Sequence, residues 1–534
     1  MKRVLIILLT ALNLVSFAQD IERERPAEWA GVVEGGRFRD HFFPMRGEEM
    51  RSDIWGADCV IPRLVDNGVE DDIFSYWGGN IYKEGDKYHL FVCAWLEKSP
   101  DGHRTWPRSV VCHTVSSSMS GPFTNLEMIG FGHNPELYRS KDGGYVIACN
   151  TNRQPIYYYS KSLEGKWQQR PFLMNDRGRG LIESFTNLTF APRADGSILM
   201  VCRGGGIWIS RNGTDEFKQI STHSVYPDRE GRFEDPVVWR DDVQYHLIVN
   251  DWYGRVAYYL RSADGVNWVE DCGEAYTPGI ALHEDGTMED WYKFERMKIF
   301  QDEDLRAVQA NFAVCDTLKI EDIGDDRHSS KNITIPLNRA LLMEIVEDTI
   351  TPKMRTISLR IKGEDDFDPH TELDIESLRF GLSSDVNYGR GCTVKRVESS
   401  GKDAIVVFNT SGYTIPDSEF APKLLGRNKQ GKIVYGYAHN PNVDCQPAIL
   451  TCTCPVQDGA NTLITVDNLG LKRSSKAKLK LSFGDKSMEY DLRELDPYES
   501  QEITIKDFTI DPQALCQADI VTIDGNIITS ELLN

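Results

Sequence analysis

A two-strand pattern that recurs five times constrains this chain more than any other feature. Each copy has an apolar strand, a turn rich in Asp or Gly, and a second strand with an aromatic or apolar alternation. A second pattern, ending in Gly and an aromatic residue, follows most copies and indicates two further strands. Units of roughly 50 residues built from short strands predict a five-bladed β-propeller in an all-β chain, and a β-sandwich is the alternative. The five copies are "NIYKEGDKYHLFVC", "ELYRSKDGGYVIAC", "LTFAPRADGSILMVC", "VVWRDDVQYHLIVN" and "MKIFQDEDLRAVQANF".

The pattern changes after Ile345, where "RTISLRIKGEDDFDPHTELDIESLRFGL" and "GKDAIVVFNTSGY" alternate like the strands of a sandwich. The last stretch has the character of a small immunoglobulin-like module. A chain of 534 residues is too long for one ordinary core, so several domains are expected. We predict a signal peptide at 1–18, a five-bladed β-propeller catalytic domain at 19–345, a β-sandwich accessory domain at 346–456 and an immunoglobulin-like C-terminal module at 457–534.

The first twenty residues, "MKRVLIILLTALNLVSFAQD", have the character of a secretory signal. Lys2 and Arg3 precede an apolar stretch from Val4 to Phe17, which is short for a membrane span. Cleavage is expected after Ala18, and the absence of a Cys at that point argues against a lipid anchor. No later segment reaches the length of a membrane span, so we expect a periplasmic or secreted protein.

The twelve cysteines do not have the spacing of a zinc site. Cys93, Cys112, Cys149 and Cys202 end or continue apolar strands, so we expect buried thiols that act as small hydrophobic residues. The closely spaced group at 445, 452 and 454 leaves a local disulfide open.

The net charge bears on the partners of the protein. The formal charge of −21 repels phosphate backbones, so we expect no nucleic-acid partner. The aromatic content of 10% suits a surface that binds sugars, and it suits a β-rich core equally well.

The candidate functional residues precede the first strand of each repeat. In a propeller these strands line the central axis, so the residues at their starts meet at one mouth. The five segments are "DDIFSYWGGN", "GHNPE", "IESFTN", "RFEDP" and "YKFERM". Their catalytic candidates are Asp72, His133, Glu183, Glu234, Asp235 and Glu295, and the substrate-binding candidates here and nearby are Arg232, Arg296, Trp77, Asn134 and Trp252.

Several carboxylates around one mouth suit the cleavage of a glycosidic bond. This reaction needs one carboxylic acid to protonate the leaving oxygen and one carboxylate to activate water or attack the sugar. Crowded like charges separate the pKa values of the two groups. Asp235 and Glu183 form the leading pair, whereas strand alternation predicts that Glu234 and Asp235 point to opposite faces. The two arginines would hold an acidic group of the substrate or orient the acids, and the tryptophans would stack on sugar rings.

The ordered set of "DP" before a strand, "DGxY" turns and "S…G.W" signatures resembles five-bladed propeller glycosidases. Glycoside hydrolase family 43 and the neoagarooligosaccharide hydrolases of family 117 are such enzymes, and the resemblance covers roughly residues 50 to 320. The resemblance implies exo-acting cleavage with an Asp base, a second Asp that tunes pKa, and a Glu or another acid as donor. The chain departs from that pattern, because "WGGN" and "HNP" stand where the first two blades would carry acids. Only the fourth blade keeps "DP", at Asp235 and Pro236.

Three functions therefore stay open. The first is an exported hydrolase that acts on an oligosaccharide or polysaccharide by acid–base catalysis without an organic cofactor. The second is a carbohydrate-binding propeller without activity, which the altered blades favour, and the third is a polysaccharide lyase. The sequence allows a structural calcium ion on the axis, although no ligand spacing demands it.

Overall fold

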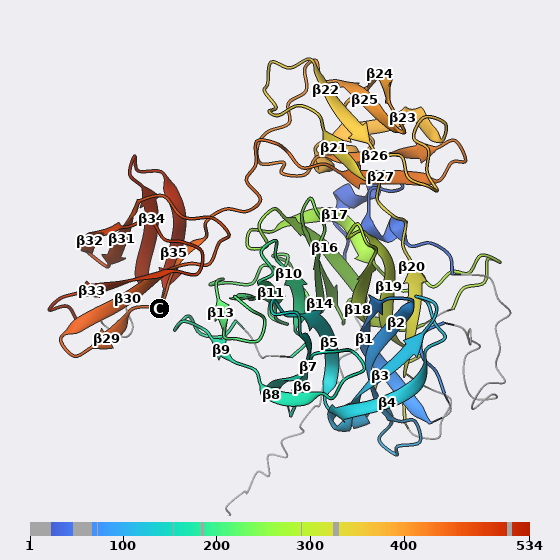
Figure 1. The fold of residues 1–534 in the computed structure, drawn as a ribbon, viewed down its shortest axis with the longest axis horizontal. Coiled ribbons are helices and arrows are strands. Elements are labelled where there is room, and N and C mark those ends of the chain that lie inside the picture. The colour runs from blue at the N-terminus through green and yellow to red at the C-terminus, as the bar shows by residue number, and fades with distance from the viewer. Residues whose placement is uncertain are drawn as a thin grey trace, which may run out of the picture.

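The computed structural model describes residues 23–45, 67–71, 73–152, 154–182, 186–289, 291–323, 330–509 and 515–533. The predicted signal peptide lies outside them. Within these residues, the repeats fold into five sheets whose neighbouring strands are antiparallel, apart from the short β9 (Figure 1). Their strands are β1 (Phe74–Glu84), β2 (Lys87–Leu96), β3 (Val110–Ser116) and β4 (Thr124–Phe131); β5 (His133–Arg139), β6 (Tyr145–Thr151), β7 (Gln154–Ser160) and β8 (Gln168–Pro171); β10 (Thr189–Pro192), β11 (Ile198–Val201), β12 (Ile207–Ser210) and β13 (Phe217–Gln219), with β9 (Met174–Asn175) at the edge; β14 (Phe233–Arg240), β15 (Tyr245–Asp251), β16 (Val256–Ser262) and β17 (Val269–Tyr276); and β18 (Lys293–Gln301), β19 (Ala307–Cys315) and β20 (Ser330–Pro336).

The first strands of these sheets form a closed ring. β1 contacts β5, β5 contacts β10, β10 contacts β14, β14 contacts β18, and β18 returns to β1. Isolated bridges of Val69 to Phe123 and to Asn332 tie the start of the propeller to its last sheet. The ring confirms the predicted β-propeller, with the first strand of every repeat on the axis.

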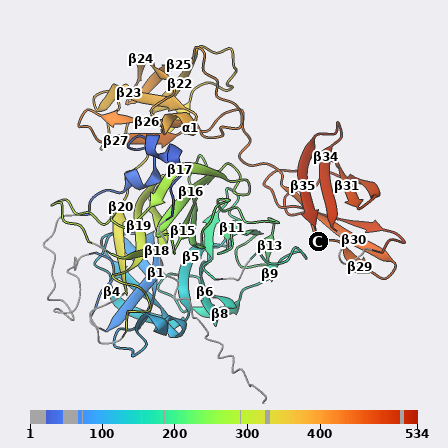
Figure 2. The ribbon, with the colours of Figure 1, turned by 180° about the vertical axis from the view of Figure 1, so that it is seen from behind.

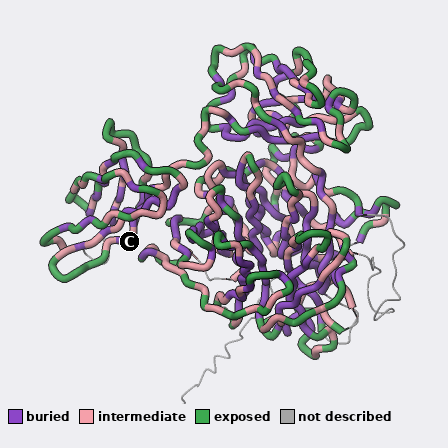
Figure 3. Tube along the Cα trace, in the orientation of Figure 1, coloured by how far each residue is buried: buried purple, intermediate pink, exposed green. Residues whose placement is uncertain are grey.

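The propeller cores lie between neighbouring sheets, which explains the sequence pattern of the strands. Residues from Leu90 to Ala94 in β2 are fully buried, because other blades cover both faces of the sheet. A run of consecutive apolar residues is typical of such a strand. By contrast, β22 (Thr356–Ile361) alternates buried and half-buried residues, since only one of its faces meets a core. Figure 3 shows the buried residues concentrated in the sheets and the exposed ones along the loops.

Two further β regions follow the propeller, and Figure 2 shows both from behind. The first packs two sheets around one core and the second packs another two. Their remaining elements are β21 (Met343–Ile345), β23 (Leu373–Gly381), α1 (Ser383–Val386), β24 (Thr393–Ser400), β25 (Asp403–Asn409), β26 (Lys423–Asn428) and β27 (Ile433–Tyr437) in the first, and β28 (Leu450–Cys452), β29 (Val456–Asp458), β30 (Asn461–Asn468), β31 (Ala477–Phe483), β32 (Lys486–Leu492), β33 (Ser500–Ile505), β34 (Cys516–Thr522) and β35 (Ile527–Leu533) in the second. Three short 3-10 helices complete the part of the fold that the structure describes: η1 (Ala27–Gly31), η2 (Phe38–His41) and η3 (Gly102–Arg108).

Buried polar contacts join both regions to the rest of the chain. The Lys423 ammonium of the first region donates to the carbonyl of Gly35 at 3.3 Å. In the second region, Asp467 forms an ion pair of 2.7 Å with Arg177 from the propeller. The two regions correspond in order to the expected sandwich and immunoglobulin-like module, but the exact domain limits stay predictions.

The thiol and membrane predictions can be compared with the described residues. Cys93, Cys112, Cys149 and Cys202 are buried and form no disulfide, as predicted. Among the described cysteines near the C-terminus, Cys452 and Cys454 are buried and Cys445 is half-buried, and no disulfide joins them, so the one left open there does not form. Among the helices of the described part of the chain, none has the length and apolarity needed to cross a membrane.

Candidate active site at the propeller mouth

The inner strand of each blade begins with the same backbone conformation. One residue adopts a positive φ, joined by Gly79 in the first blade, and in four of the five strand pairs this residue lies within a β-bulge. A bulge breaks the alternation of a strand and re-aims its side chains. These residues are Gly78 (φ 64°), Asn134 (φ 52°), Asn187 (φ 55°), Asp235 (φ 54°) and Arg296 (φ 50°).

This conformation changes the expected relation between Glu234 and Asp235. Strict alternation predicts opposite faces, but the left-handed backbone at Asp235 keeps both carboxylates at the mouth. The prediction from alternation was therefore wrong here. Glu234 accepts a hydrogen bond of 2.7 Å from the Asn187 amide, and its carboxylate lies 3.7 Å from the Arg203 guanidinium.

Asp235 is the more deeply buried of the two carboxylates, with a side chain that is 3% exposed against 23% for Glu234. It accepts hydrogen bonds from the Arg296 backbone N–H at 3.3 Å and from Arg296 Nη1 at 3.4 Å. Asp235 is thus held by a neighbouring blade, whereas Glu234 keeps an accessible edge.

The surroundings of Glu234 favour its protonated form. Burial and the negative charges of Asp235 and Glu295 together raise the pKa of Glu234 to about 7, against the opposing effect of Lys319 and Arg203. A carboxyl group with that pKa is largely protonated at mildly acidic pH, so it can donate a proton there.

Glu295 occupies the matching position in the last blade. Its Oε2 pairs with the Lys319 ammonium, and its Oε1 has no hydrogen-bond partner among the described residues. Burial raises the pKa of Glu295, although Lys319 opposes this. Burial would lower the pKa of Lys319, but Glu295, Glu234 and Asp235 outweigh it and raise that pKa above its usual range. Lys319 therefore stays charged, and its charge favours the ionised form of Glu295 against the effect of burial.

His133 lies at the mouth as a neutral group. Its Nδ1 lies 3.0 Å from the Ser109 hydroxyl and 3.5 Å from the Cys93 sulfur. Burial lowers the pKa of His133 well below its ordinary value, and the positive charges of Arg296 and Lys319 act in the same direction. The next residue, Asn134, donates a hydrogen bond from its amide to Asn187.

The substrate-binding candidates differ in exposure. Arg232 is exposed, and its guanidinium lies 4.9 Å from the centre of the Tyr253 ring. Trp252 is half-buried, and its indole N–H has no hydrogen-bond partner among the described residues. Trp77 is buried under the Lys319 ammonium, which lies 4.9 Å from its ring centre. Of these aromatic rings, Trp252 is the more open to a sugar.

Two predicted catalytic residues, Asp72 and Glu183, lie outside the described residues. Their roles stay predictions, and so does the pairing of Glu183 with Asp235. Within the described part of the chain, no group of three or more His, Cys, Asp or Glu side chains could hold a metal ion. The calcium ion that the sequence allows therefore has no described ligand set, and it stays a prediction.

A polar layer closes the axis beneath the mouth. The ammonium of Lys298 pairs with the carboxylate of Glu136, and both side chains are buried. The other carboxylate oxygen of Glu136 accepts hydrogen bonds of 2.9 Å from the Thr189 hydroxyl and the Phe190 backbone N–H. Burial lowers the pKa of Lys298 to about 8, against the opposing charge of Glu136. This buried ion pair separates the two ends of the axis.

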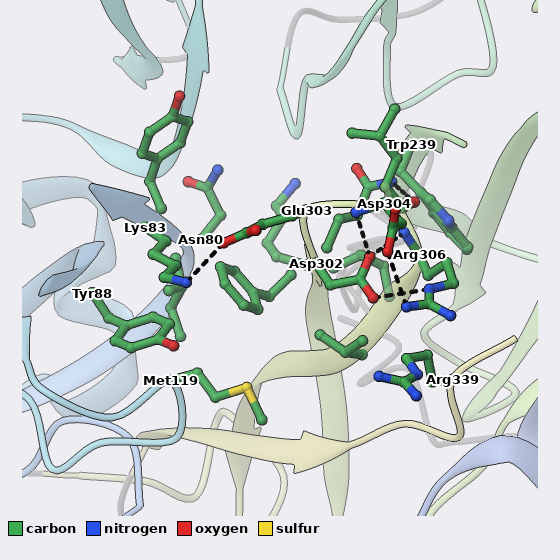
Figure 4. A pocket seen from close by; sticks show the side chains of 18 of the residues that line it. Asn80, Lys83, Tyr88, Met119, Trp239, Asp302, Glu303, Asp304, Arg306 and Arg339 are labelled. Atoms are coloured by element: carbon green, nitrogen blue, oxygen red, sulfur yellow. Dashed lines mark hydrogen bonds and ion pairs between the residues drawn. The ribbon is translucent and has the colours of Figure 1, made fainter. Parts of the chain in front are cut away.

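A cavity of about 1380 Å³ opens at the other end of the axis, between the inner strands and the β21–β27 region (Figure 4). Arg306 forms two ion-pair contacts with Glu364 at 2.8 and 2.9 Å, and a third with Asp302 at 2.9 Å. Lys83 pairs with Glu303 at 3.2 Å. Because these charges neutralise one another, this cavity offers less chemistry than the mouth.

Sequence reasoning missed Asn187, Arg203 and Lys319. An alignment of the five strand starts would have revealed Asn187, since it shares its column with Asn134 and Asp235. Lys319 lies in the loop after β19, far from any strand start, and no local pattern marks it. Arg203 follows β11 in "RGGG", which likewise gives no sign of a contact with Glu234.

Comparison with known proteins gives structural matches alone. No protein family matches the chain, and no curated protein matches it. Among solved structures, the catalytic domain of the Coprinopsis cinerea family 62 α-L-arabinofuranosidase matches 50% of this chain and 92% of its own length, with 12% identity and a TM-score of 0.39. A family 43 β-xylosidase/α-arabinofuranosidase from a compost metagenome matches 49% and 91%, with 11% identity and a TM-score of 0.31. A protein described as a glycoside hydrolase matches 83% and 94%, with 10% identity and a TM-score of 0.34.

Proposed function

We propose that this protein is an exported glycoside hydrolase that cleaves an oligosaccharide at the propeller mouth. The observation that carries the proposal is an accessible carboxyl group, Glu234, whose pKa is raised to about 7 beside two buried carboxylates. Glycoside hydrolysis needs this combination of one protonated acid and one ionised carboxylate.

In the proposed mechanism Glu234 is the general acid. It protonates the leaving glycosidic oxygen while the bond to the anomeric carbon breaks. Asp235 is a positioning residue, because its charge raises the pKa of its neighbour and Arg296 holds it in place. The Asn187 amide orients the Glu234 carboxyl from the adjacent blade.

Glu295 is the proposed base. Its Oε1 lacks a partner among the described residues, so it can accept a hydrogen bond from the attacking water. Lys319 pairs with the other oxygen, and its charge favours the ionised form of the group. The water transfers a proton to Glu295 as its oxygen bonds to the anomeric carbon. Exchange with solvent then removes the proton from Glu295 and returns one to Glu234.

One observation favours a binding protein as the second candidate. The first blade has Gly78 at the position where the other blades carry Asn, Asp or Arg side chains. The Arg296 side chain lies beside this glycine, since a Cβ there would meet its Cγ and Nε within 4 Å. A cation thus borders a place where the resemblance leads one to expect an acid.

The decisive experiment varies the leaving group. Glu234→Gln should lose about 10²- to 10⁴-fold of the activity on a natural linkage, where the departing alcohol needs a proton. The same variant should retain most of its activity on an aryl glycoside whose phenol leaves without protonation. Glu303→Gln, an exposed glutamate at the other end of the axis, is the matched control and should behave as wild type. Equal losses on both substrates would contradict the acid role, and wild-type binding without cleavage would favour the second candidate.

A further inference from the structure

The mouth is rich in cations although the chain as a whole is strongly acidic, with a formal charge of −21. Arg203 faces Glu234, and Lys319 faces Glu295. Further cations from the fourth and fifth blades lie beside aromatic residues of the mouth. They are Arg232 over Tyr253, Arg255 over Tyr292, and Lys293, which donates to the Trp252 carbonyl.

The described carboxylates at the mouth are themselves paired or largely neutral. Asp235 and Glu295 each already have one cationic partner, Arg296 and Lys319. Glu234 is largely neutral below its raised pKa of about 7. Cations around a site favour a ligand that brings its own negative charge, because their field attracts ligands of opposite sign.

Arg296 provides a specific place for such a charge. Its side chain is 1% exposed, and only Nη1 among its nitrogens has a partner, the Asp235 carboxylate. Nε and Nη2 have no hydrogen-bond partner among the described residues. A buried guanidinium N–H without an acceptor is costly, so two on the same side chain call for a ligand.

The two unpaired nitrogens lie on the same edge of the guanidinium plane. Nε–H and one Nη2–H point in parallel, and this fork matches the two oxygens of a carboxylate or a sulfate. Gly78 borders the fork without a side chain, because a Cβ there would lie 3.7 Å from Arg296 Nε. Neutral sugar hydroxyls would use this fork less well, since a single oxygen cannot accept both parallel hydrogen bonds at good geometry.

We propose that the sugar bound at this mouth carries an acidic group, a carboxylate or a sulfate ester, which the Nε and Nη2 edge of Arg296 binds. Lys319 supports it from the last blade, where it also holds Glu295. The inference deepens the proposed function, because it names the substrate class of the same site. It does not depend on cleavage, since recognition of the acidic group needs only the cations.

The test uses binding by the full-length Glu234→Gln variant, which avoids turnover. The probes are oligosaccharides from glucuronate-, galacturonate- and sulfate-bearing polysaccharides, each beside a neutral derivative in which the carboxyl is reduced to an alcohol or the sulfate is removed. We expect acidic forms to bind at least about tenfold more tightly than their neutral derivatives, the effect of one charge-assisted contact. Loss of affinity on carboxyl reduction identifies a uronate as the ligand, and loss of affinity on desulfation identifies a sulfate ester.

A second set of variants separates the fork from general attraction. Arg296→Lys keeps the charge but removes the planar fork, so it should lose at least about tenfold in affinity for the acidic form. Arg139→Gln removes an exposed cation at the far end of the axis and should bind like the parent. Circular dichroism checks that Arg296→Lys is folded. If Arg296→Lys does not fold, Lys319→Met replaces it and should weaken the preference for acidic over neutral glycans.

The outcomes separate this inference from the proposed function. Equal binding of acidic and neutral forms, or binding of neutral glycans alone, would overturn the inference, as would no binding of any acidic glycan. Tight binding of acidic glycans without cleavage by the wild type would contradict the hydrolase and leave the inference standing. Cleavage restricted to neutral glycans would support the hydrolase and contradict the inference.

Discussion

The two ends of the propeller axis differ in how their charges are satisfied. At the end with the large cavity, Arg306 meets Glu364 and Asp302, and Lys83 meets Glu303. At the mouth, polar atoms of Glu295 and Arg296 have no partner among the described residues. The comparison teaches that cavity volume alone does not locate the chemistry. Unpaired buried groups and displaced pKa values mark the functional end more directly.

Matched glutamates at the two ends give the largest expected contrast. Glu295→Gln removes the proposed base and should lower kcat/KM by about 10²- to 10⁴-fold on the natural linkage. Glu303→Gln makes the same chemical change at the cavity end, where the side chain is exposed, and should leave kcat/KM unchanged. Steady-state kinetics measures both. A comparable loss in the two variants would move the chemistry away from the mouth.

The pair that separates the two ends should matter for stability. Lys298→Met leaves the Glu136 carboxylate buried without its cation, so we expect a destabilisation of about 3–5 kcal/mol. Thermal unfolding followed by circular dichroism measures the change. The double variant Lys298→Met with Glu136→Gln should recover much of the loss, because glutamine carries no charge and can still accept from Thr189. An unchanged melting temperature for the single variant would show that the pair is not buried as described.

A smaller effect is expected on the pH profile. The proposed acid must be protonated, so kcat/KM should fall as the pH rises through the raised pKa of Glu234, about 7. Asp235→Asn removes a negative charge that raises this pKa, so the alkaline limb should move to lower pH. The profile of each variant on one substrate measures the shift. An alkaline limb that does not move in Asp235→Asn would show that a group other than Glu234 produces it.

The sequence predicted the propeller well because its repeats carry local signals. Turn residues and apolar strands mark each blade, and the axis follows from the position of the first strand. The site was predicted less well, because backbone geometry decides where side chains point. The positive φ of Asp235 places Glu234 beside it, and alternation could not show this. Lys319 reaches the mouth from a loop far along the chain, which only the closed ring explains.

The assignment of Glu234 as an accessible acid of raised pKa is the central claim, and carbon-13 NMR of glutamate carboxyl groups tests it directly. Spectra of the wild type and of Glu234→Gln, labelled at glutamate and followed over pH, identify the Glu234 resonance by its absence in the variant. We predict a titration near pH 7 for that resonance. A titration near the ordinary glutamate value of about 4.3 would contradict the account, because the mouth would then have no proton to donate at neutral pH.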